Sequence, residues 1–250
     1  VTTTTAPPPV PVIADPQVRV VHASSDAPTV NILANEEVLN GLAFVDYQQA
    51  SGIFNVGADD YTLAVEANTP DGGVQVLSFD ASLEGDMQYN VFAAGSVGDG
   101  TLEAFVVANQ QSEVTAGNAR VQIVHAAKNA PIVDIYVTAP DADISAAQPL
   151  VTLGYSENTG YVEVPAGDYR VRITAAGAKV VAYDSGTLQL GDGADLLVAA
   201  TTNVATGTSP VSLLINDGTN TSVALDVNSP AHLRAIHGVA DAPAVDIVAN

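Results

Sequence analysis

The chain contains no cysteine, no tryptophan and a single methionine among its 250 residues. The absence of cysteine excludes disulfide bonds and cysteine-ligated zinc. It does not argue against export, because a domain of about 100 residues folds without a disulfide when its core is adequate. Long apolar runs are missing as well, since Gly, Pro, Asn and Asp interrupt them before they reach the length of a transmembrane helix.

Basic residues are scarce: seven Lys and Arg side chains stand against 28 Asp and Glu side chains, and the net charge is −21 at pH 7. Nucleic acid is therefore not expected as a partner, because almost nothing here neutralises phosphates. Two interpretations of the acidic excess remain open. One is solubility at high ionic strength, where salt screens the self-repulsion. The other is binding of a divalent cation.

Calcium is the cation that the second interpretation favours, because Ca²⁺ takes oxygen ligands from flexible acidic loops. The sequence has two such loops, and neither has the complete spacing of an EF-hand. The candidate calcium ligands are Asp141, Asp143, Asp192 and Asp195. The alternative for all four is a solvated acidic loop without a metal.

Catalytic signatures are also lacking. The only serine flanked closely by glycines, Ser96, does not have the spacing of a nucleophile elbow. There is no phosphate-binding loop, no zinc-spaced histidine set and no dinucleotide fingerprint. The sequence predicts a protein that is not an enzyme and has neither catalytic nor cofactor-binding residues.

What the chain does contain is a twelve-residue pattern that occurs three times, at residues 21–32, 124–135 and 236–247. The copies are about 100 to 110 residues apart, which is the size of a whole small domain rather than of a solenoid coil. We therefore predict an array of similar domains. Its expected parts are a Thr/Pro-rich linker (1–15), a first domain (16–117), a second domain (118–229) and the opening strands of an incomplete third copy (230–250).

Both complete domains are expected to be all-β. Apolar β-branched residues alternate with other residues around Val18–His22 and again around Val121–His125, which is the period of a strand. Turn signals follow one another at intervals of about 10 to 20 residues, and no segment has a helical period. About seven short strands per 100 residues are typical of a sandwich. The predicted fold is a tandem of antiparallel, immunoglobulin-like β-sandwiches with a short joint.

The best candidate site is the polar part of the repeated pattern. An aspartate usually accepts from the N–H two residues on, but here that residue is proline, which has no N–H. The acidic or amide side chain therefore needs another partner, and the histidine four residues earlier is the expected one. The residues concerned are His22, Asp26 and Pro28, then His125, Asn129 and Pro131, then His237, Asp241 and Pro243.

Two roles are open for the histidine and its predicted aspartate or asparagine partner. One is an acid–base or metal site. The other is a structural clasp, meaning a hydrogen bond that fixes the first turn of each domain. The exchange of Asp26 for Asn129 between copies favours the clasp, because an amide can replace a hydrogen-bond acceptor but not an acid.

A second repeated pattern places a tight turn before Asp60-Tyr61 and before Asp168-Tyr169. We expect each tyrosine ring to lie on the edge of the core and its hydroxyl to reach a backbone group. A ligand-stacking tyrosine is the alternative.

These two patterns together resemble the DUF4397 family, through His-x-x-x-Asp/Asn-Ala-Pro-x-Val-Asp/Asn-Ile at the start of each unit and Val-x-Ala-x-Asp-Tyr near its middle. The resemblance covers nearly the whole chain after Pro16. It implies a tandem β-sandwich found in exported bacterial and archaeal proteins, and it implies no reaction. One departure is the connection at 137–149 in the second copy, which is longer than its counterpart in the first.

The leading functional hypothesis is an extracellular or cell-surface structural protein: a stalk, adhesin or filament subunit. The alternative is an extracellular binding module for a glycan or a cell-surface ligand, with calcium as a possible requirement. A row of exposed aromatic side chains would favour the alternative. The candidates for such a row are Tyr47, Tyr136, Tyr155 and Tyr161.

A further partner hypothesis concerns residues 231–250. About 20 residues cannot build a core, so this segment needs a host if the chain ends there. Addition of its strands to an exposed sheet edge of another copy would build a fibre. If the chain continues, the segment is the start of a third domain.

Overall fold

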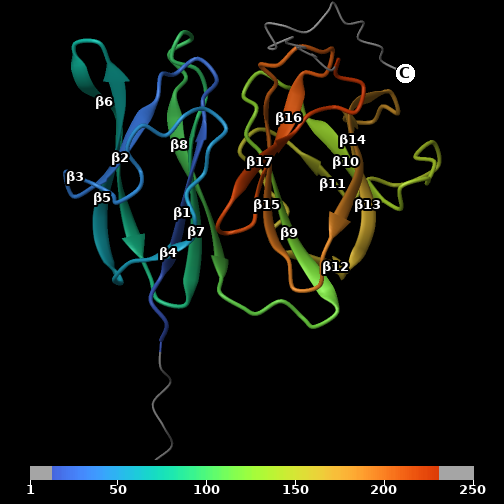
Figure 1. Cartoon of the computed structure of the whole chain (residues 1–250), viewed down its shortest axis with the longest axis horizontal. Coiled ribbons are helices and arrows are strands. Elements are labelled where there is room, and N and C mark those ends of the chain that lie inside the picture. Colours follow the sequence, from blue (N-terminus) through green and yellow to red (C-terminus); the bar gives the residue numbers. More distant parts are fainter. Residues whose placement is uncertain (1–12, 231–250) are drawn as a thin grey trace, which may run out of the picture.

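Figure 1 shows the computed structural model of the chain, in which residues 13–230 are described. This part of the chain is built from strands and turns. No helix within it is long and apolar enough to cross a membrane. The strands of the first repeat are β1 (Gln17–Ala23), β2 (Val30–Ala34), β3 (Glu37–Val38), β4 (Phe54–Asn55), β5 (Asp59–Thr69), β6 (Gly72–Leu83), β7 (Met87–Ala94) and β8 (Glu103–Gln110). Those of the second are β9 (Asn118–His125), β10 (Val133–Thr138), β11 (Val151–Leu153), β12 (Val162–Pro165), β13 (Gly167–Ala175), β14 (Val181–Leu190), β15 (Asp195–Thr202), β16 (Val211–Asn216) and β17 (Thr221–Ala224).

The strands form four sheets, which make two sandwiches. The first sandwich consists of the sheets β3-β2-β5-β6 and β4-β1-β7-β8, and the second of the sheets β12-β9-β15-β16-β17 and β11-β10-β13-β14. Each sandwich encloses its own apolar core, with Val20, Ile32 and Val91 in the first and Ile123, Ile135 and Val198 in the second. The prediction of two tandem all-β sandwiches is confirmed.

The immunoglobulin-like, purely antiparallel topology is not confirmed. In each sandwich the first strand pairs in parallel with a late strand, β1 with β7 and β9 with β15. The remaining pairs are antiparallel. A period of two residues is common to parallel and antiparallel strands, so alternation along the sequence does not reveal strand direction or order.

The two sandwiches lie side by side rather than end to end, with sheet β4-β1-β7-β8 facing sheet β12-β9-β15-β16-β17 (Figure 1). A third apolar cluster fills the space between these sheets. Its fully buried members are Val21, Ala23, Phe92, Ala94 and Val107 from the first repeat and Val124, Ala126, Leu197, Ala199 and Leu214 from the second. The central two sheets are therefore covered on both faces, and the tandem is a four-layer body with three apolar layers.

Polar side chains cross the same interface and find partners there. The Nη1 of Arg19 donates to the Oδ1 of Asn216 at 2.8 Å, and the Nδ2 of Asn90 donates to the Oε1 of Gln122 at 2.8 Å. Gln48 donates to the hydroxyl of Thr201 at 2.8 Å. Because buried polar groups are costly unless they are paired, these bonds fix one register between the sandwiches.

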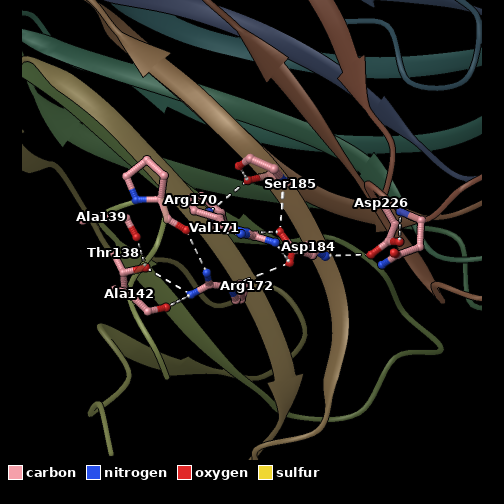
Figure 2. A network of polar contacts seen from close by, with 12 residues as sticks. Thr138, Ala139, Ala142, Arg170, Val171, Arg172, Asp184, Ser185 and Asp226 are labelled. Atoms are coloured by element: carbon pink, nitrogen blue, oxygen red, sulfur yellow. Dashed lines mark hydrogen bonds and ion pairs between the residues drawn. The ribbon is translucent and has the colours of Figure 1, made fainter. Parts of the chain in front are cut away.

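The long connection at 137–149 is held on the outer face of sheet β11-β10-β13-β14 by an ionic network (Figure 2). Arg170 makes two hydrogen bonds to the carboxylate of Asp184, at 2.7 and 2.6 Å. Arg172 lies 3.7 Å from the same carboxylate and donates to the carbonyl oxygens of Ala142, at 2.9 Å, and Pro140, at 3.1 Å. The two arginines thus tie the connection to strands β13 and β14.

A candidate ligand groove between the sandwiches

The repeated histidines are buried, but their partner is not the predicted one. His22 and His125 are each 1% exposed. Their Nε2 atoms lie 3.2 Å from the carbonyl oxygen of Pro28 and 3.1 Å from that of Pro131. Because a carbonyl only accepts, each Nε2 carries the proton and donates. The prediction of a histidine–aspartate bond is therefore wrong. The Nε2–H of each histidine donates instead to the carbonyl oxygen of the proline, two residues beyond the aspartate or asparagine.

Asp26 instead ties the first turn to the loop between β7 and β8. Its carboxylate accepts from the backbone N–H groups of Val97 at 3.0 Å and Gly98 at 2.8 Å, and from the hydroxyl of Ser96 at 2.7 Å. The bond from Gly98 contributes most to lowering the pKa of Asp26 to about 2. Asn129, its counterpart, is exposed. Residues His237, Asp241 and Pro243 lie outside the described residues, as does the whole segment 231–250.

The tyrosines of the second repeated pattern have the same geometry in both sandwiches. The hydroxyl of Tyr61 donates to the carbonyl oxygen of Gly57 at 3.0 Å, and that of Tyr169 to the carbonyl oxygen of Pro165 at 2.8 Å. The carboxylate of Asp60 accepts from the hydroxyl of Ser82, whereas Asp168 is exposed. Both tyrosine hydroxyls thus donate a hydrogen bond to a backbone carbonyl in the turn that precedes the tyrosine.

The candidate calcium ligands do not form a site. Within residues 13–230 no three His, Asp or Glu side chains are grouped in a way that could hold a metal ion. Asp195 forms a bidentate ion pair with Arg120, and Asp192 accepts from the backbone N–H of Gly117. Asp143 accepts from Ser145. Asp141 is exposed on the same connection as Asp143. Asp195 is thus neutralised by Arg120, and Asp192 and Asp143 each accept a backbone N–H.

The four tyrosines proposed as a surface row are not exposed either. Tyr136 is 1% exposed, and the other three are partly buried. Tyr47 donates to the carbonyl oxygen of Thr202 across the interface, and Tyr155 packs edge-on against Phe105, with ring centroids 5.9 Å apart. Tyr161 lies under the guanidinium of Arg120, 4.0 Å from its carbon. These rings serve packing within and between the sandwiches, and of the aromatic side chains in the described part only Phe44 is exposed.

A polar groove lies between the sandwiches, beside the segment that joins β8 to β9. It has a volume of about 580 Å³. Both sandwiches and the joining segment contribute to its walls. The lining residues are Gln17, Ile53, Asp86, Gln88, Gln111, Ser112, Glu113, Arg120, Asp195 and Asp217.

Unused hydrogen-bond donors lie at and beside the groove. Gln88, which lines it, is 3% exposed, and its Nε2 has no hydrogen-bond partner. The hydroxyl of Tyr161, the ring beneath Arg120, is buried and equally unpartnered. The same is true of the Nε of Arg19, whose charge interacts with Asp195 and Asp217. Buried polar atoms without a partner are rare in folded proteins, so the Nε2 of Gln88 in the wall of the groove indicates a place for a ligand.

Acceptors are present at the same place. Asp86, Glu113, Asp195 and Asp217 supply four carboxylates, and Arg120 is the only basic side chain that lines the groove. Burial lowers the pKa of Arg19 to about 10, so its guanidinium remains charged at neutral pH. The groove therefore combines donors and acceptors with an excess of negative charge.

The family profile for a domain of unknown function, DUF4397, matches residues 16–136 and 137–248. The chain belongs to the DUF4397 family. The profile boundary falls within β10, whereas the sheets of this DUF4397 tandem divide the chain between β8 and β9. No functionally curated protein is significantly similar to it in sequence.

The comparison with solved structures finds carbohydrate-binding modules at low sequence identity and low TM-score. One is a family 41 carbohydrate-binding module from streptococcal virulence factors, described as recognising α-glucan. The two are 13% identical over 73% of this chain and 93% of that chain, with a TM-score of 0.26. Another is a family 26 carbohydrate-binding module from Amy13K of Eubacterium rectale, in complex with maltoheptaose. Here the identity is 10% over 85% and 97% of the two chains, with a TM-score of 0.25. Such TM-scores assign no role to any residue of this chain.

Sequence reasoning did not find the groove, because its residues are scattered over both DUF4397 repeats and the segment between them. A signal was nevertheless present. Arg19, Asn90 and Gln122 are polar residues within otherwise apolar strands, and they mark the second buried face of β1, β7 and β9. Nearly continuous burial along a strand is typical of a sheet covered on both sides.

Proposed function

We propose that this DUF4397 tandem is an extracellular, non-catalytic binding module whose groove between the sandwiches takes a neutral, polyhydroxylated ligand, namely a glycan. The observation that carries the proposal is the unused buried donor of Gln88 in the wall of the groove, among the groove carboxylates. A sugar hydroxyl both donates and accepts, so one hydroxyl can satisfy a buried amide or guanidinium N–H and donate to a carboxylate.

The charge of the molecule supports a neutral ligand over an anionic one. All six Lys and Arg side chains in residues 13–230 already have partners. Arg19, Arg120 and Lys128 are engaged at or near the seam, and Arg170, Arg172 and Lys179 hold the connection at 137–149. With a net charge of −21, an anionic ligand would meet repulsion that no free cation within residues 13–230 offsets.

The pKa values support a non-catalytic role. Glycoside hydrolysis needs a carboxylic acid whose pKa is raised, so that it can donate a proton. Hydrogen bonds from the backbone N–H groups of Asn220 and Thr219 lower the pKa of Asp217. Every other carboxyl group in the described part whose pKa is shifted is shifted in the same direction. Such groups stay ionised at neutral pH and act only as acceptors.

The arrangement of the sandwiches bears on the structural alternative of a stalk, adhesin or filament subunit. A stalk gains length when its domains stack end to end. Here the domains pack side by side through a buried interface, which adds rigidity but little length. The same packing builds the groove from both repeats, so it favours the binding module.

The proposal is tested by calorimetric titration with neutral oligosaccharides from several classes: malto-, cello-, xylo- and chito-hexaose. We expect at least one class to bind, and Gln88→Leu to weaken it by about tenfold, because a lost hydrogen bond is worth roughly 1 kcal/mol or more. The matched control is Gln75→Leu on the exposed strand β6, which should bind like the wild type. Absence of binding across all classes, or unchanged affinity of Gln88→Leu, would contradict the proposal.

A further inference from the structure

A second hollow lies inside the second sandwich, between its two sheets, and Asp217 is the one lining residue that it shares with the polar groove. Its volume is about 270 Å³. The walls are almost entirely aliphatic, with Val162 from β12, Val171 from β13, Leu188 from β14 and Leu196 from β15 among them. This apolar cavity has no counterpart of similar size in the first sandwich, where the space between the sheets amounts to about 20 Å³.

The two repeats show why the sandwiches differ, because their strand registers identify equivalent positions. Val18 pairs with Phe54 and Tyr89, whereas its equivalent Val121 pairs with Val162 and Leu196. Phe54 and Tyr89 both pack in the core of the first sandwich. The second sandwich thus has an aliphatic side chain at each of two positions where the first has an aromatic ring.

A third aromatic ring of the first core has no equivalent in the second sandwich, because a β-bulge interrupts the pairing there. Phe79 pairs with Leu63 and packs in the first core. The equivalent of Leu63 is Val171, and opposite Val171 the register of β14 shifts between Thr187 and Asp184. At two other positions the second sandwich has the larger side chain: Leu188 in place of Ala81 and Val137 in place of Ala34. Their extra volume replaces only part of the volume of the three aromatic rings, and the cavity is the space that is left.

An apolar space of this size lowers stability when nothing fills it, and the first sandwich demonstrates that the fold can fill it with its own side chains. The polar groups at the cavity are Gln189, Asp217, Asn220, Ser222 and Tyr169, and the hydroxyl of Tyr169 is already bound to Pro165. No basic side chain lines the cavity. The carboxylate of Asp217 would repel a fatty acid, whereas a hydroxyl would find both donors and acceptors.

We propose that the second sandwich binds an uncharged aliphatic molecule, with its alkyl chain between the sheets and a hydroxyl head at Asn220 and Ser222. The length follows from the volume. A cavity of about 150 Å³ accommodates benzene, so a volume of this size suits a chain of roughly ten carbon atoms. This site is independent of the glycan proposal: it lies within one repeat, is apolar and would be filled by substitutions that leave Gln88 untouched.

The test uses the whole chain and 1-decanol below its solubility limit, followed by NMR of the methyl groups of Val171 and Leu188, which line the cavity and are kept in every variant. We expect these methyl signals to shift at saturable concentrations, and sodium decanoate to bind at least tenfold more weakly. The double substitution Val162→Phe with Leu196→Tyr gives the second sandwich the aromatic residues that the first sandwich has at the equivalent positions, Phe54 and Tyr89. It should weaken 1-decanol binding by at least tenfold while the melting temperature stays equal or rises.

Val180→Phe, at a side chain that is 81% exposed, is the matched control and should bind 1-decanol like the wild type. If the double variant does not fold, Val162→Phe alone is measured in the same way. Unperturbed methyl signals in the wild type, equal binding by the filled variant, or decanoate that binds as tightly as 1-decanol would each overturn the proposal.

Discussion

Truncation of Phe92 probes whether the two sandwiches form one body. Phe92 is completely buried in the apolar cluster between the sandwiches, and its ring stacks on Phe105 with centroids 4.8 Å apart and an interplanar angle of 7°. Phe92→Ala removes a ring that the packed surroundings cannot replace. Substitutions of this kind cost about 3–5 kcal/mol of unfolding free energy, of which part is transfer and part is the cavity left behind.

The assay is guanidinium unfolding followed by circular dichroism and by tyrosine fluorescence. Because the cluster belongs to both repeats, we expect one cooperative transition for the wild type and a decrease of about 3–5 kcal/mol for Phe92→Ala. Phe44→Ala is the matched control: its ring is 68% exposed, and the loss should stay within about 0.5 kcal/mol. Two separate transitions in the wild type, or a decrease of less than about 1 kcal/mol in Phe92→Ala, would refute the reasoning.

Three further outcomes are expected. His125→Ala should cost about 1–3 kcal/mol, because it leaves the carbonyl of Pro131 without its buried donor; an unchanged melting midpoint would show that the bond is not needed. Asp184→Ala should lower the melting midpoint, because Arg170 and Arg172 lose the carboxylate that they share, and an unchanged midpoint would speak against it. Asp26, whose folded pKa is lowered to about 2 mainly by the N–H of Gly98, stabilises the fold above the pKa of an unfolded aspartate. That contribution is lost as the pH falls toward 2, and a carboxyl ¹³C titration with an ordinary aspartate midpoint would disprove the assignment.

Local sequence pattern determined the parts of the fold that could be predicted. Alternation around Val18–His22 and its recurrence at Val121–His125 gave strands, and the repeat gave two similar domains. The parallel pairing of β1 with β7 was beyond reach, because the two strands are separated by the whole opposite sheet and share the same period. The side-by-side packing was hidden for a related reason: nothing local to one repeat records which of its faces meets the other.

The candidate site was less predictable than the fold. The histidine of the repeated pattern was predicted to be structural, but its partner depends on a turn that brings the carbonyl of Pro28 to its Nε2 while Asp26 binds Gly98. The groove brings together residues about 100 positions apart in the sequence, such as Gln88 and Asp195. The apolar cavity emerges only when strand register shows that Val162 stands where the first repeat has Phe54.

The central claim is that the groove between the sandwiches binds a neutral glycan through donors that the protein itself leaves unused. The side-chain amide of Gln88 reports on this directly, because its Nε2 has no partner within the described protein. The measurement is a ¹H–¹⁵N spectrum of the whole chain recorded during titration with the oligosaccharide that calorimetry selects. We expect a saturable shift of the Gln88 amide signal at the calorimetric affinity, with the exposed amide of Gln75 unchanged. A Gln88 signal that stays in place while the sugar binds would contradict it.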